Sequence, residues 1–187
     1  MPEYTDRGLM VIAVGREIRD GDLVFVGMRL PLLAFAFAKR THAPGAIGLF
    51  ENGIVRDQPA AETLMTMSDT PNIPGALWST GTLEIMSLLQ QGLADLGFGD
   101  GACWRERVGL PGGGPAAVIT TLGVYRFDPK TREMVLASWH PGQSAESVRA
   151  ATGWDLRVAD GCRQTAIPTA AELEIVRACD PAGYWTR

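Results

Sequence analysis

Apolar and polar positions along the chain fall into two repeating patterns, one typical of buried strands and one typical of helices. Continuous apolar runs at 23–26 and 47–50 predict strands that are covered on both faces. Residues 5–19 space their apolar side chains as an amphipathic helix does, and residues 31–40 are apolar on nearly all sides, which predicts a buried helix. Because strands and helices alternate, we expect an α/β fold with an open, mainly parallel sheet and flanking helices.

The rest of the chain continues this alternation between loops rich in turn residues. The other elements that we expect are a short helix at 60–67, a strand at 76–80, a helix at 83–91, a strand at 94–98, strands at 117–127 and 134–138 joined by a hairpin loop, and a strand at 156–158. Ser144 predicts the cap of a helix at 145–151, and a capping box from Thr169 to Glu172 predicts the start of a last helix that ends near Cys179.

Length and composition indicate one globular domain, 1–187. The hydrophobic fraction of 46% and the charged fraction of 20% are ordinary for a globular enzyme. The net charge of -4 and the pI near 5.2 argue against nucleic acid or an anionic membrane as the main partner. We therefore expect neither of these partners.

The cysteines and the apolar runs bear on the cellular compartment. Cys103, Cys162 and Cys179 are odd in number and lack a CxxC spacing, which argues against a disulfide framework and against a zinc site. The N-terminus lacks the charged and apolar regions of a signal peptide, and the longest apolar run, 30–38, is too short to cross a bilayer. We expect a cytoplasmic protein.

The candidate for chemistry is Glu51, which directly follows the apolar run 47–50 and precedes Asn52-Gly53. An apolar run stopped by Asn-Gly predicts a buried strand that ends in a tight turn. In open α/β sheets ligands bind at the carboxyl ends of the strands, so a carboxylate there is a functional candidate. The alternative is a glutamate at a strand end that simply faces water.

Several short motifs occur along the chain in an order that is found in a known protein family. They are DGDLVFVGMRLPLLA at 20–34, LFENGIV at 49–55, LEI with LLQQG at 83–92, DLGF at 95–98, LPGGG at 110–114, VITTLGVY at 118–125 and SWHPG at 138–142. Together they resemble the B-type subunits of family I CoA-transferases, the glutaconate CoA-transferase group in particular. This chain is similar along most of its length but is shorter, and the stretch that bridges directly from 112–115 into the strand at 117 indicates a deletion of peripheral structure.

The resemblance implies a covalent reaction at Glu51. In the family a glutamate attacks an acyl-CoA thioester, gives an acyl-glutamyl anhydride and is then converted to an enzyme-CoA thioester, which a second acid resolves. Coenzyme A is then the only cofactor, as substrate or covalent intermediate, and no metal is needed. The family also implies an A-type partner subunit, in a heterodimer or an A2B2 heterotetramer, and a small acyl-CoA substrate.

The loop after the first strand is the expected oxyanion and substrate site. Gly27 matches the first glycine of the family's Gly-x-Gly loop and Met28 its middle position, and backbone N–H groups of such a loop serve tetrahedral intermediates. Arg29 stands where the family has its second glycine. It could clamp a substrate carboxylate, fill the space of the acyl chain, or be a surface arginine on a loop.

Four further residues complete the expected binding set. Asn52 and Gly53 either orient Glu51 or make the turn that follows it. Gly113 and Gly114 allow a ligand to approach the backbone closely, or belong to a flexible linker left by the deletion.

Three other side chains are weaker candidates for a catalytic role. His140 could be a general base, although His-Pro-Gly before a helix cap favours a role in a turn, and His42 also lies in a turn. Cys103 could assist the carboxylate, but a free cysteine is usually inert.

Two other functions stay open on the same scaffold. The change to Arg29 and the shortened loop region favour an acyl-CoA or acyl-carrier thioester hydrolase or a decarboxylase more than they would in a standard member. A non-catalytic structural subunit is the third possibility.

Overall fold

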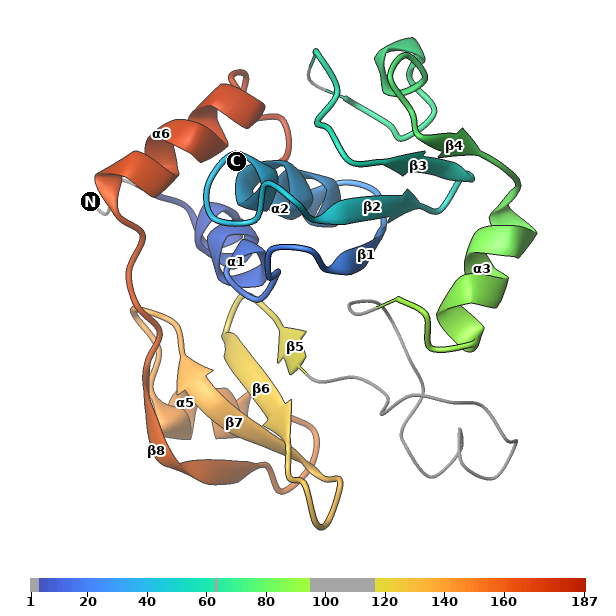
Figure 1. Cartoon of the computed structure of the whole chain (residues 1–187). Helices are drawn as coiled ribbons and strands as arrows, with labels where there is room; N and C mark the ends of the chain where they lie inside the picture. Colours follow the sequence, from blue (N-terminus) through green and yellow to red (C-terminus); the bar gives the residue numbers. More distant parts are fainter. Residues whose placement is uncertain (1–3, 63, 95–116) are drawn as a thin grey trace.

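The computed structural model describes residues 4–62, 64–94 and 117–187, which form two four-stranded sheets with flanking helices (Figure 1). The first sheet has the order β1 (Leu23–Val26), β2 (Ile47–Phe50), β3 (Ile54–Arg56) and β4 (Trp78–Ser79), and the second has the order β5 (Ala117–Ile119), β6 (Gly123–Phe127), β7 (Met134–Trp139) and β8 (Arg157–Gln164). The helices are α1 (Asp6–Gly15), α2 (Leu30–Lys39), α3 (Thr82–Gln90), α5 (Ala145–Ala150) and α6 (Ala170–Cys179), with a 3-10 turn at Thr70–Asn72.

The predicted α/β class with flanking helices is confirmed, but strand directions differ from a mainly parallel sheet. Only β1–β2 and β7–β8 are parallel among the described neighbours, and the other pairs are antiparallel. A parallel pair needs a crossover such as α2, whereas a tight turn folds the chain straight back. The Asn52-Gly53 turn does this between β2 and β3, so the same dipeptide that marks the strand end also reverses the chain direction.

Both faces of the first sheet are covered, which explains its continuous apolar runs. On one face Val26 and Phe50 join a cluster with Phe35 of α2, whose ring meets that of Phe50 edge-on at 6.0 Å. On the other face Phe25 and Leu49 pack with residues of α3. Helix α2 also packs against α1 and α6, so it is buried on several sides as predicted.

Side-chain caps define where several helices begin. Ser144 caps α5, and Thr169 caps α6 through a reciprocal capping box with Glu172, so both predicted starts are confirmed. The carboxylate of Glu172 also accepts from Arg16, with N···O distances of 2.7 and 2.8 Å, and thereby ties α6 to the end of α1.

Three predicted elements are wrong in detail. Residues 60–62 and 64–67 form a loop and not a helix, because the Asp69 carboxylate accepts the backbone N–H groups of Met65 and Thr66. The strand predicted at 117–127 is divided, since the hydroxyl of Thr120 accepts the N–H groups that turn the chain between β5 and β6. The last strand, β8, is longer than predicted.

The strand predicted at 94–98 falls mostly outside the described residues, and so does the Gly- and Pro-rich stretch up to residue 116. In the part of the chain that is described, no helix is both long and apolar enough to cross a membrane.

Candidate functional site

Glu51 follows β2 at the edge where the two parallel strands of the first sheet end. Because Val26 pairs with Phe50 in the β1–β2 register, Glu51 lies beside Gly27, and its N–H donates to the carbonyl of Val26 at 3.4 Å. The side chain is exposed, and no described residue forms a hydrogen bond or ion pair with its carboxylate. The carboxylate is therefore available to a ligand that approaches this edge.

The turn after Glu51 is fixed from two sides. The N–H of Gly53 donates to the carbonyl of Phe50 at 2.9 Å, which closes the turn, and Gly53 has a φ of +100°. A side chain at position 53 would collide with the carbonyl oxygen of Thr80, whose own N–H donates to the carbonyl of Gly53 at 2.9 Å. Glycine is thus required here by conformation and by space.

Asn52 uses its amide to hold the turn. Its Oδ1 accepts from the N–H of Ile54 at 3.3 Å, and its Nδ2 donates to the carbonyl of Met67 at 2.8 Å. Both contacts are with backbone groups and neither reaches Glu51, which is the geometry of a residue that forms a turn.

A buried polar network that sequence reasoning missed supports this turn. Asn72 is fully buried and donates to the same Met67 carbonyl at 2.6 Å, while its Oδ1 has no partner among the described residues. The buried guanidinium of Arg56 donates to four carbonyls, those of Gln58, Pro59, Asn72 and Pro74. Burial lowers the pKa of Arg56, with Asp57 opposing the shift. These carbonyls lie up to 18 residues from Arg56 along the chain. The sequence therefore offered only the arginine itself as a sign of this network.

The loop from Gly27 to Arg29 lies next to Glu51. Gly27 is buried, yet a Cβ there would meet only Pro31, at 3.9 Å, and its φ is not positive. The fold of the described residues therefore does not require a glycine at this position, and a glycine leaves room beside Glu51 for a ligand. Met28, next in the loop, is 43% exposed.

Arg29 adopts a backbone conformation that favours glycine. Its φ of 67° and ψ of −121° lie in a region that L side chains rarely occupy, at a cost of about 1–3 kcal/mol. The guanidinium carbon lies 5.6 Å from the ring centroid of Trp185, and a cation–π contact at an exposed site recovers only about 0.5–1 kcal/mol. The stacking interaction alone does not offset the cost of this conformation.

The C-terminal turn holds Trp185 in place. The buried carboxylate of Asp180 accepts the backbone N–H groups of Tyr184, Trp185 and Thr186, at 2.7 to 3.0 Å. Burial would raise the pKa of Asp180, but these hydrogen bonds outweigh it and lower the pKa below its usual value. The ring of Trp185 packs on the cluster that α1, α2 and α6 form, so it is a fixed platform for Arg29.

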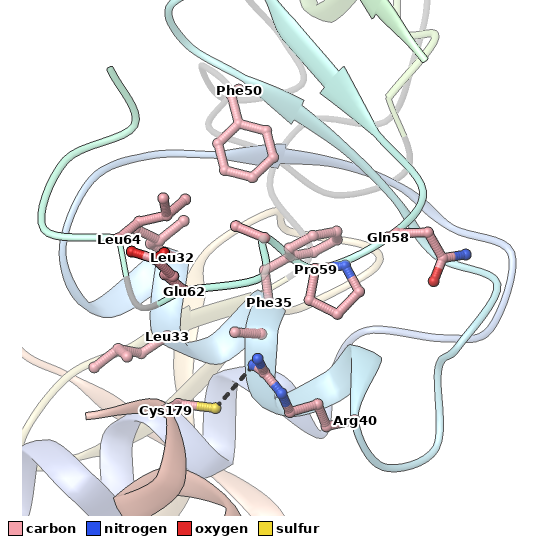
Figure 2. A pocket seen from close by; sticks show the side chains of 12 residues that line it. Leu32, Leu33, Phe35, Arg40, Phe50, Gln58, Pro59, Glu62, Leu64 and Cys179 are labelled. Atoms are coloured by element: carbon pink, nitrogen blue, oxygen red, sulfur yellow. Dashed lines mark hydrogen bonds between the residues drawn. The ribbon is translucent and has the colours of Figure 1, made fainter. Parts of the chain in front are cut away.

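A small pocket beside α2 is not the candidate site. It has a volume of about 50 Å³ and lies between α2 and residues 58–62 and 64, with Phe50, Arg40 and Cys179 among its lining residues (Figure 2). Arg40 donates to the Sγ of Cys179 at 3.1 Å, and burial raises the pKa of that thiol. The cavity is far below the size of a small-molecule site, roughly 300 Å³ or more, and Glu51 does not line it.

The two histidines take part in the fold. His140 is buried, with Nδ1 3.0 Å from the hydroxyl of Thr165 and Nε2 2.9 Å from the carbonyl of Thr120. His42 contacts the carbonyl of Ile18 through Nε2 at 2.9 Å. These contacts support the interpretation of both histidines as residues that stabilise turns.

The remaining sequence candidates, Gly113, Gly114 and Cys103, lie outside the described residues. Within residues 4–62, 64–94 and 117–187, no group of three or more His, Cys, Asp or Glu side chains could hold a metal ion. What the described site offers is an exposed carboxylate at a strand end, a glycine loop beside it, and a stacked arginine two residues further on.

No protein-family model matches the chain. Two curated relatives do. One is the B-type subunit of the 3-oxoadipate CoA-transferase of Pseudomonas knackmussii, 26% identical over 96% of this chain and 95% of the relative. The other is the B-type subunit of the glutaconate CoA-transferase of Acidaminococcus fermentans, 25% identical over 93% of this chain and 91% of the relative. The first alignment spans 246 positions and this chain has 187 residues, so at least 59 positions of the relative have no counterpart here.

Solved structures show the same fold. Glutaconate CoA-transferase from Acidaminococcus fermentans superposes with a TM-score of 0.85, covering 99% of this chain and 98% of the other at 22% identity. The decarboxylase AibA/AibB superposes with a TM-score of 0.75, covering 97% of each chain at 21% identity. The chain is thus similar over most of its length to two B-type subunits of CoA-transferases and shares the fold of glutaconate CoA-transferase, the resemblance that its motifs predicted.

Proposed function

We propose that this chain is the catalytic B-type subunit of a heteromeric CoA-transferase-like enzyme, with Glu51 as its nucleophile. The supporting observation is the position of Glu51, whose exposed carboxylate follows a parallel strand and lies beside the glycine loop at Gly27. Ligands bind at such an edge of an α/β sheet. The two curated relatives are named as B-type subunits of CoA-transferases.

The reaction proceeds by two acyl exchanges at one carboxylate. An oxygen of Glu51 attacks the thioester carbonyl, the C–S bond breaks, and CoA leaves as the thiolate from an acyl-glutamyl anhydride. The thiolate then attacks the glutamyl carbonyl, which releases the first acid as a carboxylate and leaves a glutamyl-CoA thioester. A second carboxylate reverses both steps, so the new acyl-CoA departs and Glu51 is regenerated. Backbone N–H groups of the 27–29 loop are suited to the two oxyanions.

The proposal includes an A-type partner subunit, because the described site is open on one side. Leu77, Trp78 and Leu83 are exposed, and residues 70–83 contain no charged side chain. This stretch reaches the Glu51 turn through the Thr80–Gly53 hydrogen bond. Exposed apolar surface with an aromatic residue and few charges is typical of the core of a protein interface. A partner bound there would also cover Glu51.

The acyl group and its acceptor are expected to be small acids carried by coenzyme A. The two relatives are named for 3-oxoadipate and glutaconate, so we propose short dicarboxylic acids as the first substrates to test. The chemistry requires no metal, and a pantetheine arm on a carrier protein would present the same thioester.

The test is the intact mass of the chain after incubation of the complex with acyl-CoA. We expect the mass increase of a glutamyl-CoA thioester, one CoA less one water, in the wild type and none in Glu51→Gln, with turnover lowered by about 1,000-fold or more because the nucleophile is lost. Glu62→Gln is the control, since Glu62 is an exposed carboxylate that does not belong to the proposed site.

The second candidate is thioester hydrolysis or decarboxylation on the same scaffold. The fold likeness to the decarboxylase AibA/AibB and the presence of Arg29 at a glycine-like position favour it. Thioester consumption without a CoA adduct, unchanged by acceptor acids, would support this function over transfer. A complex that shows neither adduct nor turnover would support a non-catalytic structural subunit.

A further inference from the structure

We infer that Arg29 determines specificity by binding an anionic oxygen group of the acyl-CoA beside Glu51, an inference that rests on the proposed function. The two residues follow adjacent parallel strands, and Gly27 is the neighbour of Glu51 in that register. Arg29 is two residues further along the same loop, so its backbone lies close to the edge of the sheet where the thioester would react.

The backbone conformation of Arg29 indicates that the side chain, and not the backbone, accounts for an arginine at this position. Glycine would adopt a φ of 67° and a ψ of −121° without strain, and the family's loop has a glycine at this position. The other described non-glycine residue with a positive φ is Arg132, in the exposed loop between β6 and β7. A strained conformation beside a candidate nucleophile, unlike one in a distant hairpin, is a feature of ligand sites.

The surroundings of the guanidinium leave it available to an anion. One face stacks on Trp185, which the Asp180 turn holds in place, and no carboxylate in the described part of the chain pairs with it. A guanidinium held over an aromatic ring can still donate from its N–H groups, and no hydrogen bond within the described residues uses those of Arg29. Such a fork suits carboxylate or phosphate oxygens, which it can bind through two parallel hydrogen bonds.

Two parts of the substrate carry this chemistry. One is a distal carboxylate on the acyl group, and the other is a phosphate of the CoA moiety. Both are anionic oxygen groups on a molecule whose thioester carbon must reach Glu51, and the structure is compatible with either.

The experiment is a two-by-two set of thioesters with the full chain in complex with its A-type partner. A dicarboxylic acid joined through one carboxyl and a monocarboxylic acid of equal length are each tested as the CoA thioester and as the N-acetylcysteamine thioester, which lacks phosphate. Catalytic efficiency (kcat/KM) is measured for the wild type, Arg29→Gly and Arg29→Lys. Arg132→Gly is the matched control, because it also replaces an arginine of positive φ.

We expect Arg29→Gly to lower kcat/KM by about 10- to 100-fold for the anionic substrates only, the size of one charge-assisted contact. A loss for both dicarboxylic thioesters assigns the acyl carboxylate, and a loss for both CoA thioesters assigns the phosphate. The Lys variant should recover part of the activity, and Arg132→Gly should match the wild type. The melting temperature of Arg29→Gly should equal or exceed that of the wild type, because glycine relieves the strain.

Equal changes on all four thioesters, or no change on any, would overturn the role of Arg29. A wild-type complex that is inactive on all four would instead overturn the proposed function, and with it this inference.

Discussion

At the scale of single residues, His140 illustrates how burial determines a protonation state. Its Nε2 faces the carbonyl of Thr120 at 2.9 Å, so this nitrogen carries the proton of the neutral ring. Nδ1 then accepts from the hydroxyl of Thr165, which lies 2.7 Å from the hydroxyl of Ser138. Burial lowers the pKa of His140, and the hydrogen bond to Thr120 opposes this only in part.

The lowered pKa of His140 predicts a loss of stability in mild acid. The unfolded chain takes up this proton near pH 6.5 while the folded protein resists it, so the stabilisation is present above that pH and lost as the pH falls through the folded pKa. Urea unfolding at pH 7.5 and 5.5 should show a larger decrease in unfolding free energy for the wild type than for His140→Gln. An equal decrease in both proteins would contradict the assignment.

Sequence reasoning placed Glu51 and the Asn52-Gly53 turn, because strand end and turn are local patterns. It could not find the partners of His140 or Asn52, since Thr120, Thr165 and Met67 lie 15 to 25 residues away along the chain. Nor does any local pattern reveal that Arg29 stacks on Trp185, because that contact depends on how the C-terminal turn packs against α2.

At the scale of elements, capping side chains carry much of the information that makes helices predictable. The starts of α5 and α6 were predicted because Ser144 and Thr169 act within three residues of the backbone groups that they satisfy. Residues 60–62 and 64–67 form a loop and not the predicted helix for a related reason. Asp69 binds the local N–H groups and offers the backbone an alternative to a helical turn.

Glu172 combines a cap with an ion pair and should stabilise α6 measurably. Burial would raise its pKa, but hydrogen bonds from Arg16 and Thr169 outweigh burial and lower the pKa to about 2. Glu172→Gln should therefore cost about 2 kcal/mol of unfolding free energy at pH 7, after allowance for the 19% of the side chain that stays exposed.

Chemical denaturation at pH 7 and at decreasing pH measures this contribution. Since the folded pKa lies below the unfolded value of 4.5, the stabilisation is present above pH 4.5 and lost as the pH falls through about 2. Glu174→Gln, an exposed residue of the same helix, is the control and should change stability by less than about 0.5 kcal/mol. Equal costs in the two variants would refute the special role of Glu172.

At the scale of the whole molecule, the two sheets lie at different ends and expose different surfaces (Figure 1). The α/β architecture was predictable from the alternation of strands and helices and from the ordered motifs. The mixed strand directions were not, because periodicity identifies a strand but does not say which neighbour it pairs with. The edge strand β4 has two residues, both exposed. It pairs with β3, which directly follows the Glu51 turn.

The exposed surface around β4 is where we predict that the proposed A-type partner binds. Trp78→Asp should weaken the complex by about 10-fold or more, because an aromatic residue in an interface core contributes strongly to binding and a carboxylate there stays unpaired. Trp154→Asp is the matched control, since Trp154 is 54% exposed and Trp78 50%, and Trp154 lies beside the second sheet. The dissociation constants of the two variants can be compared by titration calorimetry, and equal values would exclude this surface.

The backbone turn at Arg29 also has an evolutionary consequence. Every glycine codon can become an arginine codon through one nucleotide change, and a loop already shaped for glycine accepts the new side chain without rebuilding its neighbours. If the proposed role of Arg29 holds, substrate range could change in one mutational step while the proposed nucleophile, Glu51, and its strand remain untouched. The thermal stability lost through the strained arginine would determine how readily the arginine mutates back to glycine.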